Sequence, residues 1–117
     1  MRDVVIVDSV RTGLAKAFRG SFNLTRSDDM LAHCIDSLLD RNEQIGVDEV
    51  EDVYVGAASH TGEQDGNLAR LAVILSKLPV TAAGVTINRF CSSGLQSIAM
   101  GANQIASGQS EVVIAGG

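Results

Sequence analysis

The chain has 117 residues, 45% of them hydrophobic and 20% charged, a composition that excludes a disordered or fibrous protein and predicts one globular domain. Nine Lys and Arg residues against fourteen Asp and Glu give a net charge of −5, without a basic cluster, so we expect no nucleic-acid partner. No stretch is long enough to span a membrane, and the N-terminus does not have the pattern of a signal peptide.

The first third of the chain predicts a strand, a long loop and a helix. The run from Val4 to Val10 is nearly continuous in apolar residues, which is typical of a strand buried on both faces. Residues 11–23 are the longest irregular stretch. The helix that follows begins with a pattern similar to a capping box at Thr25 and Asp28. Its apolar stripe consists of Leu31, Cys34, Ile35, Leu38 and Leu39.

The middle of the chain repeats this alternation. Val53–Ala57 predict a second strand, and Gly62–Asn67 predict a loop because they are rich in Gly, Asn and Asp. We expect a second helix to begin with Asn67 as its N-cap and to stop at Pro79. A third strand is predicted around Val85–Asn88.

The last part of the chain predicts a third helix and a fourth strand. The helix follows Cys91, ends at Gly108, and has no charged residue near it from Phe90 to Ser110, so we expect it to be covered on all sides. One of its faces carries Leu95, Ile98, Ala99, Ala102, Ile105 and Ala106. With a strand at Val112–Ala115, the order is β-α-β-α-β-α-β. This order predicts an α/β fold, a parallel or mostly parallel sheet with helices on both faces.

The two cysteines differ in their predicted surroundings, although both are expected to be free thiols in a reducing cytoplasm. Cys34 belongs to an apolar stripe, where cysteine behaves as a small hydrophobe. Cys91 lies where a strand gives way to a helix, a turn that exposes a nucleophile at the carboxyl edge of the sheet. The adjacent helix N-terminus would stabilise a thiolate. From spacing alone, simple packing of Cys91 in a turn remains an alternative.

Other candidate residues have simpler interpretations. His33 and His60 are interpreted as solvent-facing or structural side chains, and Glu63 and Asp65 as a solvated acidic turn. Neither CxxC nor HExxH spacing occurs, so no metal site is expected. The phosphate-binding GxGxxG and Walker patterns and the GxSxG pattern of serine hydrolases are also missing.

The segment NRFCSSGLQ, residues 88–96, resembles the nucleophile motif of the thiolases, the acyl-CoA acyltransferases that cleave or form 3-ketoacyl-CoA. Further segments also resemble this family: DVVIVDSVRTGLAKAFRGSFN, GNLAR and VVIAGG. The residues that match the motif are Asn88, Cys91, Ser92, Ser93 and Gly94. One departure is that no proline follows Arg11 and Thr12, where many members have one.

The resemblance implies an N-terminal thiolase-like domain over residues 1–117, an incomplete half of a larger five-layer αβαβα architecture. It implies ping-pong acyl transfer through an acyl-cysteine on Cys91, with coenzyme A thioesters as substrates and no cofactor. It also implies a homodimer or homotetramer, and a second half with two His and another Cys. We therefore expect a truncated fragment that is inactive alone. The alternatives are a β-ketoacyl synthase-like condensing enzyme and a non-catalytic thiolase-fold module for assembly or acyl-CoA binding.

Overall fold

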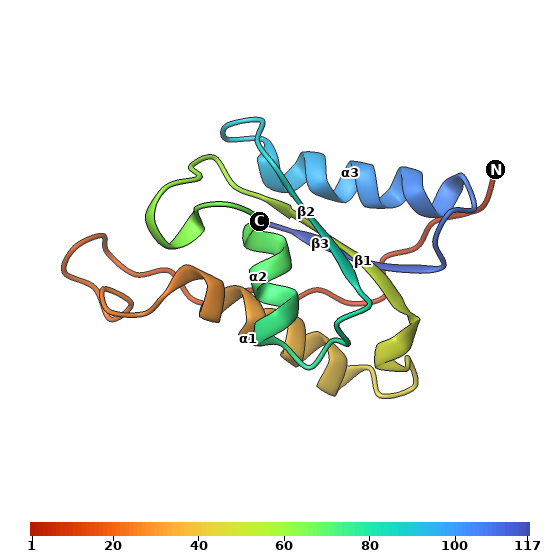
Figure 1. Cartoon of the computed structure of the whole chain (residues 1–117), viewed down its shortest axis with the longest axis horizontal. Coiled ribbons are helices and arrows are strands. Elements are labelled where there is room, and N and C mark those ends of the chain that lie inside the picture. The colour runs from red at the N-terminus through yellow and green to blue at the C-terminus, as the bar shows by residue number, and fades with distance from the viewer.

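The chain folds around a three-stranded parallel sheet (Figure 1). The computed structural model describes residues 1–117. The central strand is β1 (Val50–Gly56), with β2 (Ala83–Ile87) on one side and β3 (Val112–Gly116) on the other. These are the predicted second, third and fourth strands, so the predicted α/β class with a parallel sheet is confirmed.

Helices cover both faces of this sheet. α1 (Ser27–Arg41) and α2 (Leu68–Leu75) lie on one face, and α3 (Ser93–Ala106) lies on the other (Figure 1). Two short 3-10 turns, η1 (Val47–Glu49) and η2 (Gly62–Gln64), precede β1 and α2. No helix combines the length and the apolar composition that a membrane crossing requires.

The central strand β1 is covered on both faces, and its successive side chains point to opposite faces of the sheet. In β1, Val53 and Val55 belong to the core beneath α1 and α2, whereas Tyr54 lies close to α3. The buried cluster on the α1 and α2 face consists of Ile35, Leu39, Val50, Val53, Val55, Ala57, Leu68, Ala69, Ala72, Val73, Leu78 and Ala82.

α3 approaches the sheet through small residues. Its buried positions are Ser93, Ser97 and Gly101. A Cβ atom on Gly101 would lie only 3.0 Å from the nearest β3 side chain, so a larger residue there would push the helix away from the sheet. The predicted apolar face points elsewhere: Leu95 is 73% exposed and Ile98 42%. These 117 residues therefore leave one side of the helix uncovered, and cover for that side would have to come from outside them.

The run Val4–Val10, predicted as the first strand, does not join the sheet. The N–H of Arg2 donates to the last turn of α3, and the carboxylate of Asp8 accepts hydrogen bonds from Arg41 and Asn42 at the end of α1. The exposed side chains of this run include Val5, Ile6 and Val7. Apolar periodicity indicates burial but does not specify a neighbour. Because β2 and β3 already pair with the two edges of β1, the run cannot pair with the central strand.

The capping box predicted at Thr25 and Asp28 is not formed. α1 begins at Ser27, and its N-cap Arg26 makes no side-chain cap. Asp28 is instead a buried carboxylate that pairs with Arg26 at 2.8 Å. The first N–H of the helix, that of Ser27, donates to Glu63 Oε1 at 2.6 Å. The α1 N-terminus is thus capped by a residue 36 positions away.

The start of α2 agrees with the prediction. Asn67 is its N-cap, and the Asn67 side chain accepts a hydrogen bond from the N–H of Arg70 at 3.2 Å. The same side chain donates to the carbonyl oxygen of Gly84 in β2, which fixes the helix start against the sheet. The helix ends at Leu75, four residues before Pro79, so it is shorter than predicted.

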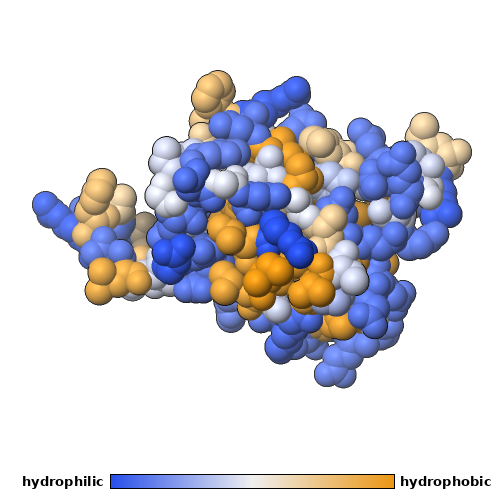
Figure 2. Space-filling model, viewed as in Figure 1, coloured by the Kyte–Doolittle hydropathy of each residue, from blue (hydrophilic) through white to orange (hydrophobic).

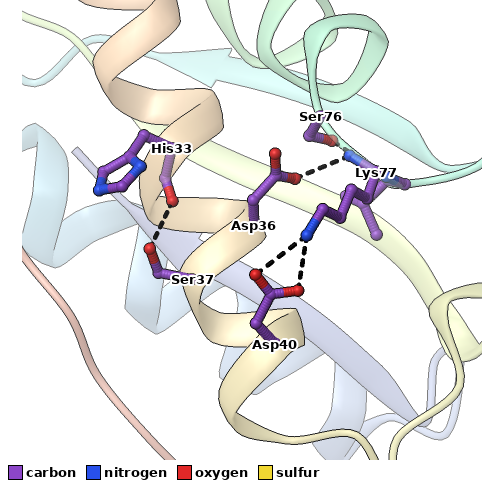
Figure 3. Close-up of polar contacts among 7 residues, drawn as sticks. His33, Asp36, Ser37, Asp40, Ser76 and Lys77 are labelled. Carbon is purple, nitrogen blue, oxygen red and sulfur yellow. Dashed lines mark hydrogen bonds and ion pairs between the residues drawn. The ribbon is translucent and has the colours of Figure 1, made fainter.

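A lysine after α2 ties this helix to α1 (Figure 3). The ammonium of Lys77 donates to both carboxylate oxygens of Asp40, at 2.7 and 2.9 Å, and the N–H of Lys77 donates to Asp36 at 2.7 Å. The contact with Asp40 raises the pKa of Lys77. Because these side chains are exposed, the contact fixes the geometry of the helix pair more than it contributes stability.

Candidate active site

Cys91 lies between β2 and α3. The turn that joins these two elements stands at the carboxyl edge of the sheet (Figure 1). Its thiol is free and exposed, whereas Cys34 is free and only partly accessible on α1. The sequence predicts this place for Cys91 correctly. Cys34, however, lies at the margin of the predicted stripe, because α1 buries Ala32, Ile35 and Leu39.

The turn before Cys91 has an unusual backbone. Phe90 adopts a positive φ of 47°, in the left-handed region that residues with a side chain rarely occupy. The N–H of Phe90 donates to the Asn88 side chain at 2.9 Å, and its carbonyl oxygen accepts from the Ser93 hydroxyl at 2.6 Å. Such a reversal between a strand and a helix presents the next residue, Cys91, to solvent.

The N-terminus of α3 offers free hydrogen-bond donors beside Cys91. The N–H groups of Ser92 and Ser93 are used within the turn. No hydrogen bond within the chain uses the N–H groups of Cys91, Gly94 or Leu95. A helix N-terminus with unpaired donors favours negative charge nearby.

The end of β1 and the start of α3 meet so closely that glycine is required at position 56. A Cβ atom on Gly56, the last residue of β1, would collide with the carbonyl group of Ser93 at the start of α3. A Cβ on Gly94 would lie 3.6 Å from the carbonyl oxygen of Gly117. The Ser97 hydroxyl lies 2.6 Å from the Gly94 carbonyl oxygen and 2.7 Å from that of Gly116. These contacts fix the helix N-terminus to the sheet edge.

The loop after β1 supports the turn from the other side. The Asn88 amide donates to the carbonyl oxygen of Ala58 at 3.3 Å, and the N–H of Ala57 donates to Ile87 at 2.9 Å. His60 Nε2 lies 2.9 Å from the carbonyl oxygen of Ala57. The structure thus places His60 in a backbone contact of this loop, in agreement with its structural interpretation.

Sequence patterns did not reveal three contacts around this edge. Ser92 is the N-cap residue of α3 but its side chain makes no cap, and the Ser93 hydroxyl instead bonds backwards into the turn. Gly56 carries no signal in the sequence except its place at the end of a strand. Glu63, interpreted as solvated, caps α1, and this contact lowers its pKa. All three depend on segments that meet only in the fold.

Two surface hollows lie away from Cys91. One, of about 380 Å³, is formed by polar side chains near the C-terminal half of α3 and by Tyr54. The other, of about 480 Å³, lies between residues 12–25, Met30 and Glu63. No group of three or more His, Cys, Asp or Glu side chains is arranged to hold a metal ion. The candidate site is therefore the exposed turn itself.

Comparisons with known proteins agree with the motif around Cys91. Residues 4–117 match the family model of the thiolase N-terminal domain. The chain is 42% identical over 116 residues to the β-ketoadipyl-CoA thiolase of Pseudomonas knackmussii and 41% identical over 117 residues to the 3-ketoacyl-CoA thiolase of Vibrio vulnificus. It is 45% identical over 116 residues to the 3-ketoacyl-CoA thiolase of Acinetobacter baylyi.

These alignments cover 99%, 100% and 99% of this chain but only 29%, 30% and 30% of the three relatives. The chain thus spans less than a third of the length of the relatives that it matches. Because the N-terminal-domain model of this family matches residues 4–117 and the relatives align along the whole chain, the chain belongs to the thiolase family.

Proposed function

We propose that Cys91 is the nucleophile of an acetyl-CoA C-acyltransferase, a thiolase that acts on 3-ketoacyl-CoA and acetyl-CoA. The observation that carries this proposal is the position of an exposed thiol at the start of α3, beside unpaired N–H groups, in a chain of the thiolase family. Cys34 lacks such donors and is partly covered on the side of α1, so it is not the acyl acceptor.

In the first half-reaction, Cys91 Sγ attacks the carbonyl carbon of an acyl-CoA thioester. The bond from this carbon to the CoA sulfur breaks, CoA leaves as a thiolate, and the acyl group stays on Sγ. The N–H groups of Cys91, Gly94 and Leu95 are the donors free to stabilise the oxyanion of the tetrahedral intermediate. These residues therefore supply the nucleophile and part of the charge stabilisation.

The second half-reaction needs a base that removes the α-proton of another acyl-CoA. The resulting carbanion attacks the acyl carbon of the acyl-cysteine, the bond from this carbon to Sγ breaks, and Cys91 leaves as a thiolate while the 3-ketoacyl product forms. Thiolysis is the reverse. Neither His33 nor His60 is such a base in this proposal, since His60 contacts its own loop and His33 lies on α1. We propose that the base lies in a further part of a longer protein, because the relatives are more than three times as long as the matched segment.

We also propose a homo-oligomer, a dimer or tetramer, in the cytoplasm. The outer surface of α2 supports this assembly, because hydrophobic residues gather over it in the middle of the face seen in Figure 2. The exposed residues there are Leu71, Ile74, Leu75 and Val80. An apolar patch rimmed by polar residues is typical of a protein interface. The free thiols of Cys34 and Cys91 are compatible with a reducing compartment.

Incubation with acetyl-CoA tests the proposed nucleophile. We expect the protein to gain the mass of one acetyl group, with release of free CoA, and peptide mapping to place this group on Cys91. Cys91→Ala should abolish the gain, and Cys34→Ala, the matched control, should leave it unchanged. An acetyl group retained by Cys91→Ala would assign the nucleophile to another residue.

A further inference from the structure

The two serines after Cys91 have opposite surroundings. Ser93 is 3% exposed, whereas Ser92 is exposed and its side chain makes no cap to the helix. The Ser93 hydroxyl accepts a hydrogen bond from the N–H of Arg89 at 2.8 Å and donates to the carbonyl oxygen of Phe90 at 2.6 Å. One buried hydroxyl thus joins the two residues before Cys91 to the first residue of α3.

The unusual backbone conformation of Phe90 is held by hydrogen bonds and not by packing of its side chain. Phe90 has a positive φ of 47°, which is disfavoured for a residue with a side chain and persists only where the surrounding structure fixes it. The Phe90 ring is 76% exposed, so its packing is a poor anchor. The backbone of Phe90 is instead held by polar contacts, from the Asn88 side chain on its N–H and from the Ser93 hydroxyl on its carbonyl oxygen.

We propose that Ser93 is a positioning residue for acyl transfer to Cys91, an inference that rests on the proposed function. The start of α3 is fixed to the sheet edge by the contact at Gly56 and by the Ser97 hydroxyl. Ser93 connects this fixed helix start to the turn. It thereby sets the position of the Cys91 thiol relative to the unpaired N–H donors of the first turn.

Acylation and alkylation of the same thiol separate positioning from simple accessibility. Attack on a thioester forms an oxyanion that needs the N–H donors, whereas displacement of iodide from iodoacetamide forms no oxyanion. A nucleophile displaced by about 1 Å costs about 10²-fold in rate, similar to the loss of one oxyanion donor. A loosened turn should therefore slow acylation far more than alkylation.

The experiment measures both rates on Cys91, with acetyl-CoA and iodoacetamide as reagents. For Ser93→Ala we expect acetyl uptake to fall about 10²-fold, while alkylation changes by less than about threefold. Ser92→Ala is the matched control and should keep both rates. Ser93→Thr retains the hydroxyl and should recover most of the acetyl uptake. The alkylation rate of Cys34 in the same samples reports whether α1 and its packing remain intact.

The outcomes separate this inference from the function on which it rests. If the unmodified protein takes up no acetyl group on Cys91, the proposed function fails, and the inference fails with it. If it takes up acetyl and Ser93→Ala behaves as Ser92→Ala does, only the inference is overturned. If Ser93→Ala unfolds, which faster alkylation of Cys34 would show, a variant of the exposed Asn88 becomes the test of the inference. Asn88→Ala must then lower acetyl uptake selectively, and an unchanged uptake overturns the inference.

Discussion

At the scale of single residues, two cysteines of one chain differ in position, accessibility and neighbours. Cys91 follows a residue with positive φ and precedes a helix, so its thiol is exposed. Cys34 lies within α1, one position away from the buried Ile35. Accessibility and nearby N–H donors are two of the factors that govern thiol reactivity, and both favour Cys91.

We therefore expect a thiol reagent at limiting dose near neutral pH to label Cys91 ahead of Cys34. Peptide mapping of the natively folded protein after a short exposure to iodoacetamide measures the two yields. In denaturant the two residues should react at similar rates, which serves as the control. Equal labelling in the native state, or labelling of Cys34 first, would contradict the assignment of Cys91 as the accessible thiol.

The place of Cys91 between a strand and a helix could be predicted from the sequence because its signal is local. A strand, a cysteine and a run of small residues follow one another within a few positions, and the family motif spans the same positions. The hydrogen bonds of Ser93 could not be predicted, because Ser92 and Ser93 have the same chemistry and only the helix direction decides which of them is buried. The contact of Glu63 with Ser27 joins positions 36 apart and has no local pattern.

At the scale of elements, three of the four predicted strands and all three predicted helices are present. β2 and β3 are each joined to α3 by a short connection, and α3 packs against β3, its neighbour in the sequence. The run Val4–Val10 has the same apolar pattern but is followed by a long irregular segment before α1. Its pattern indicated burial, and nothing in it could specify which strand it should join.

Because the end of β1 packs directly against the start of α3, we expect the addition of one methyl group at Gly56 to destabilise the protein. In Gly56→Ala, the new Cβ would collide with the backbone of Ser93, which cannot rotate away as a side chain could. We expect a loss of about 1–3 kcal/mol in the free energy of unfolding and slower acylation of Cys91. Thermal unfolding should show a midpoint lower by roughly 5 °C or more.

Gly116→Ala is the matched control, because a Cβ on this last residue of β3 would have no heavy atom within 4 Å. Its thermal midpoint should stay close to that of the unmodified protein. If Gly56→Ala were as stable as Gly116→Ala, α3 would not be held against the sheet edge as tightly as the structure indicates.

The carboxylates at the start of α1 predict a dependence of stability on pH. The hydrogen bond from the Ser27 N–H lowers the pKa of Glu63, and the pairing with Arg26 lowers that of Asp28. A group whose pKa is lower in the folded state stabilises the protein above its unfolded pKa, about 4.3 for Glu and 3.9 for Asp. This stabilisation is lost as the pH falls through the folded pKa.

Glu63→Gln should therefore lower the thermal midpoint at pH 7 and reduce its fall between pH 5 and pH 3. Glutamine retains an acceptor for the Ser27 N–H but cannot become charged. Asp65→Asn is the control from the same loop, since the Asp65 side chain accepts a hydrogen bond only from the N–H of its neighbour Gly66. Thermal melts at several pH values give the result. If the pH dependence of the thermal midpoint is unchanged in Glu63→Gln, the contact between Glu63 and Ser27 makes no pH-dependent contribution to stability.

At the scale of the whole molecule, the sheet has one well-filled face and one thinly covered face. The buried cluster lies between the sheet and the helices α1 and α2. α3 covers the opposite face through small residues, and its own apolar side chains Leu95 and Ile98 point outward. In a family whose matched members are more than three times as long as this segment, the outer side of α3 is a surface available to the rest of such a protein.

The 117-residue chain taken alone should therefore have no thiolase turnover, even with Cys91 intact. We expect it to accept an acyl group, but the second half-reaction needs a positioned base, and general acid–base catalysis is worth about 10²–10⁴-fold. A missing oxyanion donor for the second substrate adds about 10²–10³-fold. The exposed apolar side of α3 should also drive self-association, which light scattering would detect.

The decisive assay is cleavage of acetoacetyl-CoA by CoA with a purified, monodisperse preparation of the chain. A rate well above the blank that disappears in Cys91→Ala would show that these residues already contain the base, and the histidines of the chain would then be the first candidates.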